Sequence, residues 1–141
     1  MFKFFKNKDK YIQQNSDLLL KTASLLIHAA KIDEHYTEKE KLIIKEALLS
    51  LDPKNSNIEK LMIDAENEEK KSNQILDFTK EIKNSDLSYK VKIIEILWKI
   101  IYSNKEADMY ESSLMTRLSG LLYLDKKLAG EIKERIKKDL L

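Results

Sequence analysis

Residues 33–40 read DEHYTEKE and residues 104–111 read NKEADMYE, and these two similar stretches decide the fold. Each stretch lies between two apolar segments that have the periodicity of helices, and each ends in a glutamate, Glu40 or Glu111. A short acidic loop therefore joins two helices at two places along the chain. This repetition predicts two related helix–loop–helix halves packed into one domain.

Composition supports a single compact all-α domain. The chain has 141 residues, enough for one hydrophobic core, and contains only two glycines and one proline. Apolar periodicity predicts about seven helices, near residues 16–32, 37–51, 56–70, 73–83, 88–103, 108–122 and 126–138. The first and fifth are expected at the centre, because apolar residues cover more than one of their faces. Residues 1–15 are expected to form an N-terminal extension that precedes a helical domain of residues 16–141.

Charge and residue usage exclude several classes of function. The 26 basic and 24 acidic residues nearly balance, which gives no argument for nucleic-acid binding. The chain has no cysteine, so disulfides, thiolate zinc sites and thiol nucleophiles are absent. No stretch approaches the roughly 20 apolar residues of a membrane span, and the N-terminus lacks the apolar region of a secretory signal. We therefore expect a cytoplasmic protein.

The two acidic loops allow a structural interpretation. Thr37 with Glu40, and Asp108 with Glu111, have the spacing of capping boxes. In a capping box the first side chain accepts a hydrogen bond from the backbone N–H three residues on, and the glutamate reaches back to the first residue's own N–H. Each such cap contributes about 1 kcal/mol to stability. On this interpretation the loops only start helices.

The alternative is a site for a divalent cation such as Ca²⁺, Mg²⁺, Mn²⁺ or Zn²⁺. Carboxylate and amide oxygens are suitable ligands for hard cations. The spacing is not that of an EF-hand, and the second loop has Lys105 where the first has Glu34, which disfavours a site there alone. The candidate ligands are Asp33, Glu40, Asn104, Glu106, Asp108 and Glu111.

Other polar residues have ordinary structural interpretations. Glu95 lies in an apolar helix, where a buried carboxylate would need a partner, and we predict Arg117, one of two arginines in the chain. The alternative is that each of the two side chains reaches solvent at the edge of the core. Trp98 is expected to pack in the core, with a platform for a ligand as the alternative, and His28 is expected to be partly buried and hydrogen-bonded. The almost wholly charged segment 66–71, at the end of the third helix, is expected to be solvated.

The N-terminal extension alternates aromatic and basic residues and suggests an interaction. Its side chains could contact an anionic membrane or a protein partner, which would place the protein peripherally at the inner membrane. The alternatives are a disordered end or a segment folded over its own domain. The residues concerned are Phe2, Phe4, Phe5, Lys3, Lys6, Lys8 and Lys10.

No catalytic constellation is present in the sequence. There is no Gly-x-Ser-x-Gly elbow, no glycine-rich phosphate loop and no spacing that singles out a pair of carboxylates. We therefore interpret the chain as a non-enzyme.

The chain resembles the TerB family of tellurite resistance proteins, in particular its short stand-alone bacterial members, over about residues 16–138. The segments that carry the resemblance keep the family's order and spacing: residues 29–33 (AAKID) followed by Glu40, residues 95–98 (EILW) ahead of Asn104, Tyr110–Glu111, residues 117–123 (RLSGLLY), and Gly130. Both loops depart from the family's Asp-Gly, since they have Asp33-Glu34 and Asn104-Lys105.

The resemblance implies an all-helical domain of two related halves, with a role in tellurite resistance or in chemical and envelope stress. Family members are regarded as metal-responsive or protein-binding modules, and a related domain precedes J domains in membrane-bound co-chaperones. Two hypotheses follow: a module that binds or senses a divalent metal, or a protein-interaction scaffold with a membrane-associated partner and no metal site.

Overall fold

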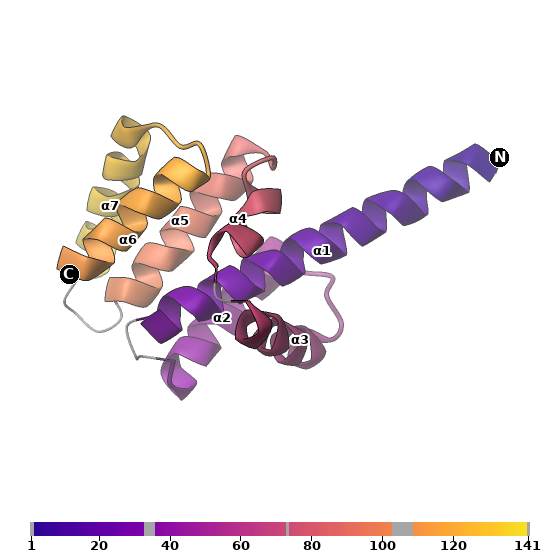
Figure 1. Ribbon diagram of the computed structural model, residues 1–141, viewed down its shortest axis with the longest axis horizontal. Coiled ribbons are helices and arrows are strands. Elements are labelled where there is room, and N and C mark those ends of the chain that lie inside the picture. Colours follow the sequence, from indigo (N-terminus) through magenta and orange to yellow (C-terminus); the bar gives the residue numbers. More distant parts are fainter. Residues whose placement is uncertain (1, 33–35, 73, 103–108, 141) are drawn as a thin grey trace.

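The computed structural model describes residues 2–32, 36–72, 74–102 and 109–140, and their side chains except in 2–16, 109–112 and 140. Within those ranges all regular structure is helical, which confirms the predicted all-α fold. The helices are α1 (Phe2–Ile32), α2 (Glu38–Leu51), α3 (Ile58–Lys71), α4 (Leu76–Ile82), α5 (Leu87–Tyr102), α6 (Met109–Leu121) and α7 (Lys126–Leu140) (Figure 1).

Helices α1 and α5 organise the core, as their apolar patterns predict. The second half of α1 packs on α2, α3, α4 and α5, while α5 packs on α1, α2, α6 and α7. Each of the two helices is buried on several faces, because the sequence places apolar residues all round it. The buried apolar residues of α1 are Leu19, Ala23, Leu25, Leu26, Ile27, Ala29 and Ala30, and those of α5 are Ile93, Ile94, Ile96, Leu97, Trp98, Ile100, Ile101 and Tyr102.

Helix α1 begins much earlier than its apolar pattern indicates. The predicted start near Ser16 is wrong, because the helix already starts at Phe2 and is 31 residues long. No glycine or proline lies in this part of the chain, so nothing ends the helix where the apolar periodicity stops. Its N-terminal half extends beyond the other helices (Figure 1). The other helix bounds differ from the predicted ones by a few residues.

A tight turn joins α6 and α7 and sets them side by side. Its backbone bonds run from the Leu124 N–H to the Ser119 carbonyl (2.9 Å) and from the Tyr123 N–H to the Gly120 carbonyl (3.1 Å). These two bonds define a Schellman motif. The left-handed position, where glycine is the usual residue, is occupied by Tyr123 with φ of 60°. The turn makes α7 fold back against α6 and α5.

Candidate functional site

Glu40, in the first turn of α2, is fully engaged in starting that helix. Its side chain is buried, with 1% of its surface exposed. Its carboxylate accepts a hydrogen bond from the Thr37 backbone N–H (3.1 Å) and another from the Thr37 hydroxyl, and the two residues form a capping box. The capping interpretation is therefore confirmed for the first loop.

The electrostatics of Glu40 fit this role. Burial alone would raise the pKa of its carboxyl, but the hydrogen bonds from Thr37 and from backbone amides outweigh burial and lower the pKa. The carboxylate is thus ionised at neutral pH and has hydrogen-bond donors around it. The Thr37 N–H and hydroxyl both bond to the same carboxylate oxygen, Oε2, which is thereby engaged at the start of α2.

The other members of the candidate metal shell cannot be placed. Asp33, Asn104, Glu106 and Asp108 lie outside the described residues, and only the backbone of Glu111 is described, in α6. In the ranges that the structure describes, no group of three or more His, Asp or Glu side chains is arranged to hold a metal ion. A metal site built from the loop residues therefore stays a prediction.

Tyr36 anchors the chain between the first loop and α2. Its hydroxyl donates a hydrogen bond to Glu66 of α3 (2.7 Å). The Lys41 and Lys31 ammonium groups lie 5.1 and 5.7 Å from the centroid of its ring, within cation–π range. Burial and the contact with Glu66 raise the pKa of Tyr36 above its usual value, so the phenol stays protonated. Tyr36 thereby ties the start of α2 to α3 and to the end of α1.

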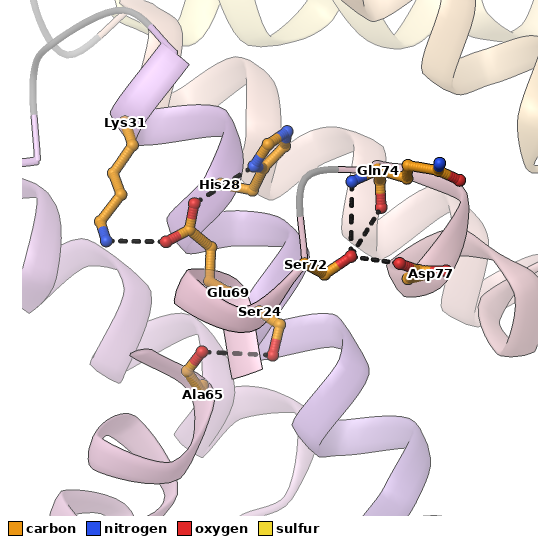
Figure 2. Close-up of polar contacts among 8 residues, drawn as sticks. All are labelled: Ser24, His28, Lys31, Ala65, Glu69, Ser72, Gln74 and Asp77. Carbon is orange, nitrogen blue, oxygen red and sulfur yellow. Dashed lines mark hydrogen bonds and ion pairs between the residues drawn. The ribbon is translucent and has the colours of Figure 1, made fainter. Parts of the chain in front are cut away.

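Glu69 of α3 is the centre of a second polar cluster, at the interface with α1 (Figure 2). One of its oxygens lies 2.7 Å from the Lys31 ammonium and the other 3.3 Å from His28 Nδ1. Its burial opposes ionisation, but the bonds from Lys31 and His28 outweigh it and lower the pKa of the Glu69 carboxyl. The prediction of a partly buried, hydrogen-bonded His28 is confirmed.

The prediction that the charged end of α3 is solvated is correct for Asn67, Lys70 and Lys71, which are exposed, and wrong for Glu66 and Glu69, which are partly buried. Glu66 and Glu69 face α1 and the start of α2, where they bind Tyr36, Lys31 and His28. Nearby, the buried Ser24 hydroxyl contacts the Ala65 carbonyl at 3.4 Å (Figure 2). The interface between α1 and α3 is thus apolar in part and is extended, toward the end of α1, by these polar contacts.

Glu95 pairs with Arg135 of α7 and not with Arg117, so the predicted partner is wrong. Helix α7 packs closely along α5, and this brings Arg135 to Glu95. Arg117 lies on the exposed side of α6, beside a hollow of about 240 Å³ that His28 and Leu76 also line. The sequence offered two arginines of similar character, and only the helix packing distinguishes them.

Replacing Arg135 by glutamine should lower the free energy of unfolding by no more than about 1 kcal/mol, because its side chain is 55% exposed. Arg117→Gln should change it by less than about 0.5 kcal/mol. Chemical denaturation of both variants measures the difference. An Arg117→Gln variant that is the less stable of the two would contradict the observed pairing.

Trp98 packs in the core, as predicted. Its ring is stacked on Tyr102 with centroids 5.4 Å apart, and the Lys133 ammonium lies 5.3 Å from its centroid. The side chain lies between α5, α6 and α7, where it is buried and lines a hollow. The predicted contacts of the N-terminal extension, from Phe2 to Lys10, involve side chains outside those described.

The structure thus defines an all-α protein with seven helices among the described residues, in which Glu40 caps a helix and Glu66 and Glu69 join two helices. Within the described ranges, no helix has both the length and the apolar character needed to cross a membrane.

Residues 19–134, most of the chain, match the family model described as tellurite resistance protein TerB, and the chain belongs to this family. The TerB domain is generally a non-catalytic module associated with tellurite resistance. No curated protein and no solved structure matches the chain, so the assignment rests on the family model together with the all-α fold.

Proposed function

We propose that this TerB protein acts in tellurite resistance, or a wider chemical stress response, as a non-catalytic module that binds another protein. The proposal is supported by one observation about the acidic side chains. Glu40, Glu66 and Glu69 are each engaged in contacts that stabilise the fold. Catalysis needs an acid or base free to exchange a proton with a substrate. Carboxylates held in caps and ion pairs are poorly suited to that task.

The divalent-metal hypothesis requires Glu40 to bind a metal ion instead of capping α2. As a ligand through Oε2, the oxygen that accepts from the Thr37 backbone N–H and hydroxyl, Glu40 would have to give up these bonds, and the capping box would be lost. Because the cap contributes about 1 kcal/mol, metal binding through Glu40 would act against the start of α2. This cost favours the protein-binding hypothesis, with a membrane-associated protein as the partner that the sequence suggested.

Thermal unfolding of Glu40→Gln, with and without metal ions, separates the two hypotheses. Glutamine can still accept the bond from the Thr37 N–H, so the variant should lose less than about 1 kcal/mol. After both proteins have been stripped of metal, we expect any change that Ca²⁺, Mg²⁺, Mn²⁺ or Zn²⁺ causes in the midpoint of thermal unfolding to be the same in the variant as in wild type. Glu38→Gln is the matched control, since Glu38 lies in the same helical turn with a 92% exposed side chain.

A metal site that uses Glu40 would give another result. An ion at 100 times its dissociation constant adds about 2.7 kcal/mol, which should raise the wild-type midpoint by roughly 5–10 °C. A rise of that size in wild type and Glu38→Gln, absent from Glu40→Gln, would replace the proposal with a metal-binding module. If Glu40 binds a metal, the Glu40→Gln variant should also fail to support growth in cells that depend on the protein for growth on tellurite. Under our proposal, we expect the variant to support growth.

A further inference from the structure

The two glycines of the chain are unusual, because both lie inside helices and both line the same groove. Gly120 is in α6 and Gly130 in α7. Apart from the adjacent residues and the backbone of its own helix, a Cβ atom added at either position would meet no atom within 4 Å, and neither glycine has a positive φ. Glycine is among the least favourable residues in a helix. The fold therefore needs neither glycine, and both leave space open at the surface.

The groove that they line has a buried, mostly apolar floor. Its volume is about 390 Å³, within the range of small-molecule sites. Trp98, Met115 and Leu124 form the floor, and each is less than a tenth exposed. The floor also includes Ser119, whose hydroxyl donates to the Met115 carbonyl (2.9 Å). An apolar group could thus be buried here without leaving that hydroxyl unpaired.

The charge at the edges of the groove has one sign. Lys126 and Lys133 line it, and none of the described residues that line it is acidic. Lys133 already contacts the face of Trp98, and among the described residues neither lysine has a carboxylate within ion-pair distance. An anion at this edge would meet two ammonium groups beside a low-dielectric floor, where electrostatic attraction is stronger than in water.

We propose that the groove between α6 and α7 binds a small organic anion with an apolar body, of the class of a medium-chain carboxylate. The apolar body lies on Trp98 and Met115, in the space that Gly120 and Gly130 leave open. The carboxylate pairs with Lys133 and Lys126. This site is separate from the acidic loops, and it goes beyond the proposed protein-binding function.

Trp98 makes the proposal directly testable, because it is the one tryptophan in the chain and lies on the floor of the groove. The full-length protein is titrated with octanoate, and Trp98 fluorescence is recorded. We expect a saturable change that weakens at high salt. The neutral analogue 1-octanol should bind at least tenfold more weakly, and octylamine more weakly still, since the two lysines repel it.

Variants locate the site. Gly120→Leu should fill the groove and abolish the response, whereas Gly120→Ala, which keeps most of the space, should retain it. Lys133→Gln should weaken octanoate binding about tenfold, and Lys137→Gln, at an exposed position of the same helix outside the groove, should leave it unchanged. Circular dichroism establishes that each variant is folded.

Three outcomes would overturn the proposal: no fluorescence change with octanoate, equal binding of octanoate and octanol, or a Gly120→Leu variant that is folded and still responds. None of them bears on the proposed function, for which the unfolding and tellurite growth assays of Glu40→Gln are separate tests.

Discussion

Replacing Phe78 by alanine should lower the free energy of unfolding by about 3–5 kcal/mol, the usual cost of deleting a buried aromatic ring. Phe78 lies in α4 with no exposed surface, and its ring contacts His28 of α1 at a centroid distance of 5.5 Å. Helix α4 has only seven residues, too few to be stable without packing. The Phe78 ring is thus the largest of the buried side chains that hold α4 in place, beside Thr79 and Ile82.

The effect of Phe78→Ala should appear in two measurements. The midpoint of thermal unfolding should fall by about 10–20 °C, and amide hydrogen exchange should accelerate in α4 more than in α5. Leu76→Ala is the matched control in the same helix, because Leu76 is 51% exposed and its truncation should cost less than about 1 kcal/mol. Similar losses for the two variants would show that α4 is not held through Phe78.

Replacing Glu69 by alanine should be the second large effect, with a loss of about 2 kcal/mol at pH 7. The side chain is 11% exposed, and its removal leaves both Lys31 and His28 without their acceptor. The expected loss is smaller than for a fully buried pair, because Lys31 is about one-third exposed. Urea denaturation at pH 7 measures it.

The loss should depend on pH in a direction that follows from the lowered pKa of Glu69. A carboxyl whose pKa is lower in the folded than in the unfolded state stabilises the protein when the pH is above the unfolded-state pKa, which is near 4.5. This stabilisation is lost as the pH falls through the folded-state pKa. The difference between wild type and Glu69→Ala should therefore shrink below about pH 4.5.

Glu68→Ala is the matched control for Glu69→Ala, because it removes the same side chain, with the same charge, from the neighbouring position of α3. Glu68 is adjacent in α3 and pairs with Lys21 of the same α1, but at 3.4 Å and with a 36% exposed side chain. We expect a loss below about 1 kcal/mol. Equal losses for the two glutamates would mean that the cluster of Glu69, His28 and Lys31 has no special role.

Much of the fold was predictable because apolar periodicity is a local signal. Helices α2 and α5 begin and end within one residue of their predicted bounds, and the cap at Thr37 and Glu40 forms as its spacing indicates. The proline after Asp52 and the scarcity of glycine leave few alternatives to these boundaries. The start of α1 was missed because residues 1–15 contain neither an apolar stripe nor a helix breaker.

The polar contacts were less predictable, because they depend on how helices pack. Nothing local in the sequence tells that Glu69 lies against α1 while the neighbouring Glu68 is more exposed, or that Arg135 reaches Glu95 and Arg117 does not. The groove over Trp98 is a tertiary feature too, since it requires α6 and α7 to bring Gly120 and Gly130 to the same surface.

The sequence by itself determined the all-α class, the central position of α1 and α5, the TerB resemblance and the cap of α2. Each of these depends on residues close together in the chain or on their overall pattern. The tertiary structure decided which charged residues pair and where an apolar surface stays open. Those outcomes depend on the angles and distances between helices, which place side chains from distant parts of the chain within a few ångströms of one another.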